Sequence, residues 1–261
     1  MAASSKLTRK EKRTQRREKL QNLPVSRIIP NVLTLSALCA GMTSIKFALE
    51  DRWEHAIIAI LIASVFDVLD GRAARILDSA SEFGAELDSL SDFINFGVAP
   101  SLVIYLYAMH QWGRPGWVIS LFFAICCGFR LARFNSMDIE ESEDKTWMKK
   151  YFVGVPAPMG GLTVLIPLMI NVQLDDKMHV GLFAFFLILG GVLMVSRVPT
   201  FALKSRSLPS KYVLPFFIVA GLSALGFISY PWIVLPMGCL FYLAAIPFSY
   251  YSFKKQNAQS L

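Results

Sequence analysis

Four aspartates with helical spacing carry the strongest chemical signal in the sequence. Asp67 and Asp70 lie three residues apart, and Asp88 and Asp92 lie four residues apart. On two α-helices these spacings place each pair of side chains on one helix face. A turn through residues 78–81 would bring the two faces together. The sequence therefore predicts four carboxylates that converge on one point.

These acids lie beside apolar sequence, which argues against side chains that are simply solvated at helix ends. Asp67 follows Ile62–Phe66, and Asp92 precedes Phe93–Phe96. An ionised acid at membrane depth costs about 2.5–3.5 kcal/mol even on the lenient insertion scale, and the two arginines that follow Asp70 cannot neutralise four acids. Ligands that are all carboxylate oxygens favour Mg²⁺ or Mn²⁺ over Zn²⁺. The cluster therefore predicts a hard divalent cation.

Small residues on the same two faces add a second feature. Gly71, Ala74 and Gly84 lack bulky side chains and lie between the aspartates in the sequence. They would leave a slot against the backbone, beside the acids. Divalent metal that clamps phosphate oxygens, with an arginine nearby, is the arrangement used in phosphoryl-group transfer. This is the chemistry that the spacing favours.

The whole pattern from Asp67 to Asp92 resembles the signature of the CDP-alcohol phosphatidyltransferase family. That signature reads D-x2-D-G-x2-A-R-x8-G-x3-D-x3-D, and the sequence matches it at every fixed position. The resemblance implies a helical membrane fold, usually a homodimer, that joins an alcohol to the phosphatidyl group of CDP-diacylglycerol and releases CMP. It also implies a pair of divalent ions, Mg²⁺ or Mn²⁺.

The resemblance assigns roles by position. Asp67, Asp70 and Asp88 would be metal ligands. Asp92 would bind the second ion and act as the general base that takes the proton of the attacking hydroxyl. The CDP-diacylglycerol site would be lined by residues of the first three helices, namely Asn31, Thr34, Gly71, Ala74, Arg75, Ser81 and Gly84.

Within the family, three further stretches resemble the bacterial phosphatidylserine synthases of the integral-membrane type. They are residues 30–34, 127–135 and 152–158. L-Serine is then the expected acceptor, and Arg130, Arg133 and Asn135 would face the acids and hold its carboxylate, which suits the two-pronged guanidinium group. Arg133 is the first candidate for this contact, with Arg130 one turn earlier. The plainer interpretation of the two arginines is that they anchor a helix end at the cytosolic surface.

Long apolar stretches must position these residues. The chain is 54% hydrophobic and only 17% charged, and its mean hydropathy is +0.48, whereas soluble domains carry about 25% charged residues. Apolar runs long enough for a bilayer predict an all-α membrane protein of about eight transmembrane helices. We expect them at 28–49, 53–76, 84–109, 116–134, 155–173, 179–196, 212–229 and 231–252.

The loops between these helices predict an orientation. Alternate loops are rich in lysine and arginine, and the positive-inside rule then places both termini and the aspartates on the cytosolic side. Residues 1–27 form a basic cytosolic tail with nine lysines or arginines; beside a membrane helix, such a tail favours anionic lipid over nucleic acid. Residues 28–175 would be the catalytic helices, 176–252 additional membrane helices, and 253–261 a cytosolic tail.

Three functions remain open at this stage. The favoured one is a phosphatidylserine synthase of the bacterial inner membrane, with its active site facing the cytosol. The first rival keeps the chemistry but uses glycerol 3-phosphate, inositol phosphate or choline as the acceptor. The second rival is a metal-ion transporter, which the position of the acids at the helix ends disfavours because transport sites tend to lie near the membrane midplane.

Overall fold

The chain is almost entirely helical in the residues that the computed structural model describes, which are 25–77, 79, 81–139, 151–174, 178–196, 198–201, 221, 225–227 and 229–257. The elements are α2 (Val25–Leu49), α3 (Trp53–Ile76), α4 (Glu82–Asp92), the π-helix η1 (Phe93–Val98), α5 (Ala99–Tyr107), the 3₁₀-helix η2 (Met109–Trp112), α6 (Arg114–Ile139), β1 (Tyr151–Val153), α7 (Ala157–Leu174), α8 (Val180–Val195), β2 (Pro199–Phe201) and α10 (Pro231–Asn257).

The predicted all-α membrane fold is confirmed, and the protein is a multi-pass membrane protein. Five described segments are long and apolar enough to cross a bilayer, namely Ile28–Leu49, Glu82–Tyr107, Arg114–Ser136, Ala157–Leu174 and Pro231–Phe248. Helices suit this setting because they satisfy their backbone hydrogen bonds internally. The predicted span at 212–229 lies mostly outside the described residues, as do the tail at 1–27 and residues 258–261. The cytosolic placement of the termini and the functional division of the chain stay predictions.

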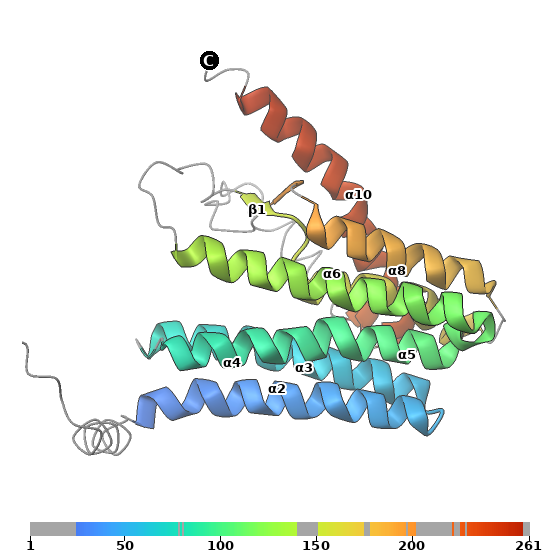
Figure 1. Cartoon of the computed structure of the whole chain (residues 1–261), viewed down its shortest axis with the longest axis horizontal. Coiled ribbons are helices and arrows are strands. Elements are labelled where there is room, and N and C mark those ends of the chain that lie inside the picture. The colour runs from blue at the N-terminus through green and yellow to red at the C-terminus, as the bar shows by residue number, and fades with distance from the viewer. Residues whose placement is uncertain are drawn as a thin grey trace, which may run out of the picture.

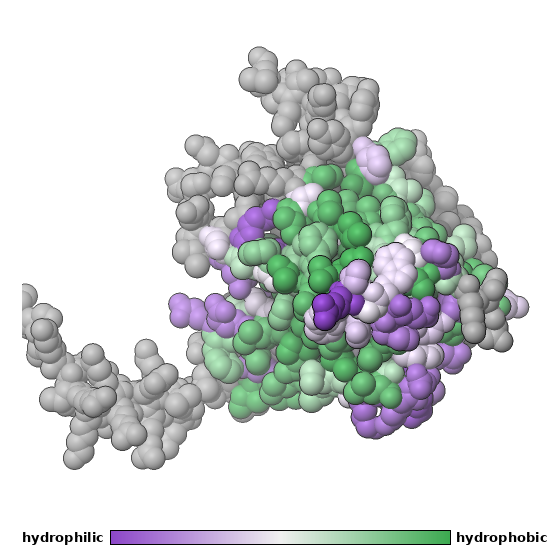
Figure 2. Space-filling model, turned by 45° about the vertical axis from the view of Figure 1, so that its right-hand side comes forward, coloured by the Kyte–Doolittle hydropathy of each residue, from purple (hydrophilic) through white to green (hydrophobic). Residues whose placement is uncertain are grey.

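Helices α2 to α6 and α8 run side by side in Figure 1, and α10 crosses them obliquely. Helix α2 packs against α3, α6 against α8, and α7 against both α8 and α10. The large apolar side chains that remain exposed lie along the lengths of these helices, for example Val65 on α3, Phe129 on α6 and Phe241 on α10. Figure 2 shows the resulting surface, which is largely apolar with hydrophilic residues gathered in groups. Such a surface suits contact with lipid.

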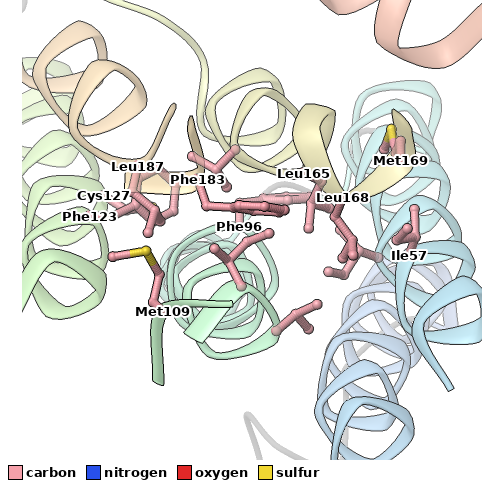
Figure 3. Close-up of a cluster of buried hydrophobic side chains, with 14 of the residues drawn as sticks. Ile57, Phe96, Met109, Phe123, Cys127, Leu165, Leu168, Met169, Phe183 and Leu187 are labelled. Carbon is pink, nitrogen blue, oxygen red and sulfur yellow. The ribbon is translucent and has the colours of Figure 1, made fainter. Parts of the chain in front are cut away.

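Phe96, in η1, lies at the centre of the packed core. Figure 3 shows it with Leu165 and Leu168 of α7 to one side and with Phe123 and Leu187 to the other. All five side chains are fully buried. The segment that follows Asp92 is therefore fixed from several sides, which leaves the acid-bearing helix little freedom to move.

The helix that carries Asp88 and Asp92 is interrupted, which the sequence analysis did not predict for residues 84–109. Directly after Asp92 the chain enters the π-helix η1, where the N–H of Ala99 donates to the carbonyl of Ile94, five residues back. Pro100 has no N–H and cannot extend an α-helical ladder to the carbonyl of residue 96. The extra residue in this turn is a physical response to that gap.

A short antiparallel pair of strands was not predicted either. Tyr151 of β1 lies opposite Phe201 of β2, and the N–H of Gly154 donates to the carbonyl of Val198 at 2.9 Å. Gly154 has a φ of 82°, and a Cβ there would come within 2.8 Å of the Ser196 carbonyl oxygen. Only glycine fits such a place. The pair ties the start of α7 to the end of α8.

Candidate active site

Three of the four aspartates that the sequence predicted to converge meet between α3 and α4. Asp67, Asp70 and Asp88 each offer a carboxylate oxygen, and these oxygens lie within 4.8 Å of one another. Asp70 is buried, and the other two are partly buried. Helical spacing on α3 aligns the first two, and α4, which begins at Glu82, carries the third. In Figure 1 the end of α3 and the start of α4 lie toward the left-hand end of the bundle.

Asp92, the fourth aspartate, adjoins the other three through its contact with Asp67. The two carboxyl groups lie within hydrogen-bonding reach of each other, and Asp92 Oδ1 is buried without a hydrogen-bond partner among the described residues. The ion pairs found in the described part of the chain lie elsewhere, at Glu50. The close carboxylates of Asp67, Asp70 and Asp88, together with the orphaned buried oxygen of Asp92, fit a divalent cation, because buried charge must be paired.

A pocket of about 140 Å³ opens beside the acids, where the sequence predicted a slot. Its lining includes Asp70 and Asp88 and six of the seven residues expected at the CDP-diacylglycerol site. These six are Asn31, Thr34, Gly71, Ala74, Ser81 and Gly84. Residues from three helices, far apart in the sequence, therefore meet around one hollow that adjoins the carboxylates. That they bind the nucleotide stays a prediction.

Ser81 and Gly84 shape the start of α4. The Ser81 side chain caps this helix by accepting a hydrogen bond from the Gly84 N–H at 3.0 Å, as serine commonly does at a helix N-terminus. A Cβ at residue 84 would lie 3.2 Å from Asn31 Oδ1. The bare backbone of Gly84 therefore gives the Asn31 amide its place in the pocket.

Arg75 is the one expected member of this site that does not line the pocket. Its Nε donates to the Gly71 carbonyl at 2.8 Å, and its side chain is exposed. The hydrogen bond holds the guanidinium over the turn of α3 that contains Asp70 and Gly71. A role for Arg75 at the nucleotide stays a prediction.

Arg130 of α6 is the cation that faces the acids. Its charge acts on both Asp67 and Asp92, and its Nε is buried without a hydrogen-bond partner in the described part of the chain. A guanidinium so placed can receive an anionic group beside the aspartates.

Arg133 and Asn135, the other two residues predicted for the acceptor, make contacts within the protein. The guanidinium of Arg133 donates to the carbonyl oxygens of Val195 at 2.9 Å and Ser196 at 3.3 Å. It thereby caps the C-terminus of α8, a common use of arginine. Asn135 Nδ2 donates to Ser89 Oγ at 3.0 Å, which joins α6 to α4 next to Asp88. The structure therefore brings Arg130 to the acids and gives Arg133 a different set of partners.

Ser79 is a pocket residue that the sequence analysis missed. It lies between α3 and α4, lines the pocket, and has a buried hydroxyl without a hydrogen-bond partner among the described residues. It falls within the eight variable positions of the signature, and the sequence analysis placed it only in the turn at 78–81. Only the fold shows that this hydroxyl turns inward.

A sequence model of the CDP-alcohol phosphatidyltransferases matches residues 27–202, which is more than half of the chain. A second model, described as CDP-alcohol phosphatidyltransferase 2, matches residues 211–247. The chain belongs to the CDP-alcohol phosphatidyltransferase family. Members of this family use divalent metals, which agrees with the carboxylate cluster of this CDP-alcohol phosphatidyltransferase, although the identity of its ion stays a prediction.

Curated relatives of this phosphatidyltransferase carry the name CDP-diacylglycerol–serine O-phosphatidyltransferase. The protein of that name from Mycobacterium tuberculosis is 36% identical over 224 residues, which cover 85% of this chain and 78% of the relative. The one from Helicobacter pylori is 38% identical over 177 residues, covering 66% and 70% respectively. The one from Bacillus subtilis is 35% identical over 138 residues, covering 53% and 73%.

Proposed function

We propose that this chain is a phosphatidylserine synthase, which transfers the phosphatidyl group of CDP-diacylglycerol to the hydroxyl of L-serine and releases CMP. The observation that carries the proposal is the meeting of Asp67, Asp70 and Asp88 at the edge of a pocket lined by the family's nucleotide residues. The names of the relatives support serine as the acceptor.

Bound Mg²⁺ or Mn²⁺, a pair of ions in our proposal, would neutralise the diphosphate and the departing CMP. Asp67, Asp70 and Asp88 would hold it, and Asp92 would also serve the second ion. The negative charges of these carboxylates would repel a substrate phosphate, so the diphosphate needs the cation at this end of the site in order to bind. The small side chains of Gly71 and Ala74 leave room for the nucleotide against α3.

Asp92 is the residue that we assign as the general base. It accepts the proton of the serine hydroxyl while the serine oxygen forms a bond to the β-phosphorus, the one that bears the diacylglycerol. The bond from that phosphorus to the bridging oxygen breaks, and CMP leaves with the electron pair. The buried Oδ1 of Asp92 has no hydrogen-bond partner among the described residues, which supports this role because a proton acceptor needs an available lone pair.

Within the acceptor site, the contacts favour Arg130 over Arg133. An amino-acid acceptor has a carboxylate that needs a cation within a few ångströms of the reacting hydroxyl. The positive charge of Arg130 acts electrostatically on Asp67 and Asp92, whereas Arg133 already holds the end of α8. We therefore assign the serine carboxylate to Arg130, with Asn135 at the edge of the same site.

We further propose that the enzyme is a homodimer of the bacterial inner membrane with its site facing the cytosol. Arg72 and Arg75 lie in the last turns of α3, and Arg130 and Arg133 lie in the second half of α6. In Figure 1 the end of α6 lies at the same end of the bundle as the end of α3 and the start of α4. The positive-inside rule places that end in the cytosol, where serine and CDP-diacylglycerol head groups are accessible.

The decisive experiment is an acceptor screen. Purified protein in detergent is given CDP-diacylglycerol, Mg²⁺ or Mn²⁺ and one acceptor at a time, and CMP release is measured. We expect turnover with L-serine, little with glycerol 3-phosphate, inositol phosphate or choline, and none in excess chelator. Turnover with glycerol 3-phosphate and none with serine would overturn the serine assignment. Undiminished turnover in chelator would overturn the metal-assisted mechanism, and metal flux in vesicles without transfer would favour the transporter.

A further inference from the structure

Thr34 of α2 is bonded to both acid-bearing helices. Its buried hydroxyl donates to Asp70 Oδ2 on α3 at 2.6 Å. Its carbonyl oxygen accepts a hydrogen bond from Ser91 Oγ on α4 at 3.3 Å. The same hydroxyl also lies 3.0 Å from the Pro30 carbonyl, but it has a single hydrogen and an ionised carboxylate can only accept. With Asp70 ionised, the Thr34 hydroxyl donates its hydrogen to Asp70 Oδ2 rather than to the Pro30 carbonyl.

The network continues from Ser91 into the π-helix. Asn95 Nδ2 donates to Ser91 Oγ at 3.0 Å, and both side chains are buried. Asn95 lies in η1, where the extra residue per turn sets the direction of its side chain. It faces Gly41 of α2, where a Cβ would lie only 2.0 Å from Asn95 Oδ1. No other residue at position 41 would let the two helices approach this closely.

These contacts form one continuous polar chain, which we call the Thr34 relay: Asn95 to Ser91, Ser91 to the Thr34 carbonyl, and the Thr34 hydroxyl to Asp70. It runs through a bundle whose other interior contacts are largely apolar. A hydrogen bond from a hydroxyl to a carboxylate at this length belongs to the strong, charge-assisted class. Another orientation of Thr34 or Ser91 would break one of these hydrogen bonds, so both side chains resist rotation. Asn95 Oδ1 is buried without a hydrogen-bond partner among the described residues.

We propose that Thr34 is a positioning residue of the metal site, which orients the Asp70 carboxylate and sets α3 against α4 through Ser91 and Asn95. The inference rests on the proposed function only in taking the aspartates as metal ligands. Hydrogen bonds to the groups that ligate a metal fix their orientation, and their loss typically costs about 10- to 100-fold in metal affinity or activity. The role is additional to a contact of Thr34 with the nucleotide in the pocket.

The test measures Mn²⁺ binding without substrate, from the free-ion electron paramagnetic resonance signal, on purified full-length protein in detergent. Thr34→Val keeps the shape and removes the hydroxyl, and we expect it to raise the Kd for Mn²⁺ by about 10- to 100-fold. Thr34→Ser should restore most of the affinity. Unchanged affinity in a folded Thr34→Val protein would overturn the proposal, as would an equal loss in Thr34→Ser.

The chain offers a matched control on the same helix. Thr43 is exposed, and its hydroxyl donates to the Cys39 carbonyl at 2.6 Å without touching an acid. Thr43→Val therefore removes the same kind of intrahelical bond, and it should leave the Kd for Mn²⁺ unchanged. An equal loss of affinity in this control would assign the effect to α2 as a whole and overturn a specific role for Thr34.

Ser91→Ala keeps the Thr34 hydroxyl and tests the positioning role of Thr34 if the Thr34→Val protein does not fold. Because it breaks the relay one step further from Asp70, it should raise the Kd for Mn²⁺ by less than Thr34→Val, with Ser36→Ala of the exposed face of α2 as its control. No change in Ser91→Ala would overturn the relay. Since no substrate is present, these outcomes do not depend on the acceptor, and a failed serine assay leaves them readable.

Discussion

The two ends of the helical bundle treat charged and polar groups in opposite ways. At one end, which we call the aromatic end, Lys46 pairs with Glu50 at 3.0 Å and both side chains are well exposed. The Trp53 and Tyr107 rings pack edge to face there, with centroids 4.9 Å apart. The buried Asn171 amide donates to the Tyr107 hydroxyl and accepts from the Met178 N–H. Glu50 is paired with Lys46 and Arg52 there, and this buried amide is hydrogen-bonded.

The opposite end, which we call the acid end, has the reverse character. Asp67, Asp70 and Asp88 gather like charges, while Asp92 Oδ1 and Arg130 Nε are buried without hydrogen-bond partners among the described residues. Such an arrangement is unfavourable unless a ligand completes it. The aromatic end therefore stabilises the folded protein, whereas the unpaired groups of the acid end lower its stability and leave a site in which a ligand can bind.

Asp92→Asn is the sharpest way to test the acid end. The amide keeps the shape but cannot take a proton, so we expect turnover to fall by about 10²- to 10⁴-fold, while CDP-diacylglycerol still binds. Single-turnover CMP release and lipid binding, measured on the same preparation, separate the two effects. A variant that works at near-native rates at neutral pH would remove Asp92 from the mechanism.

Arg130→Lys should have a smaller effect that is confined to serine. Lysine keeps the charge but loses the planar two-point contact with a carboxylate. A charge-assisted hydrogen bond contributes about 1.5–3 kcal/mol, so the KM for serine should rise roughly 10-fold or more, and that for CDP-diacylglycerol should change much less. Arg133→Lys is the matched control. It should lower thermal stability by loosening α8 and leave the KM for serine nearly unchanged, and the reverse pattern would return the carboxylate to Arg133.

Glu50→Gln, at the aromatic end, should have the smallest effect. The pair with Lys46 is exposed, and such pairs contribute at most about 1 kcal/mol. Turnover, the KM for serine and Mn²⁺ binding should all match those of the parent protein. A marked loss of activity would contradict the distinction between the two ends, because it would show that the aromatic end affects the acid end.

The sequence predicted the helices well because the bilayer imposes a simple rule on their length and polarity. The expected span at 53–76 coincides with α3 (Trp53–Ile76), and the expected start at 84 falls two residues inside α4. The aspartates were predicted for a similar reason, since their spacing is read directly on a helix face. The interruption after Asp92 was missed, although Pro100 was a signal for it.

The roles of the two arginines could not be predicted from sequence. Arg130 and Arg133 are three residues apart, so on a helix they point in neighbouring directions. Which of them meets the acids depends on what packs beside α6. The end of α8, more than sixty residues away in the sequence, accepts the hydrogen bonds of Arg133. Local sequence patterns cannot predict a contact between residues that lie so far apart in the chain.

The sequence by itself determined the chemistry of the site and which residues form it, namely four carboxylates on two helix faces and the small residues between them. Those features follow from residue type and helical period, which are local properties. Only the tertiary structure decided how the site is supported, because the Thr34 relay, the inward turn of Ser79 and the choice between Arg130 and Arg133 depend on contacts between distant segments. Hydrogen bonds of this kind act over about three ångströms, and no periodicity in the sequence records which partners come that close.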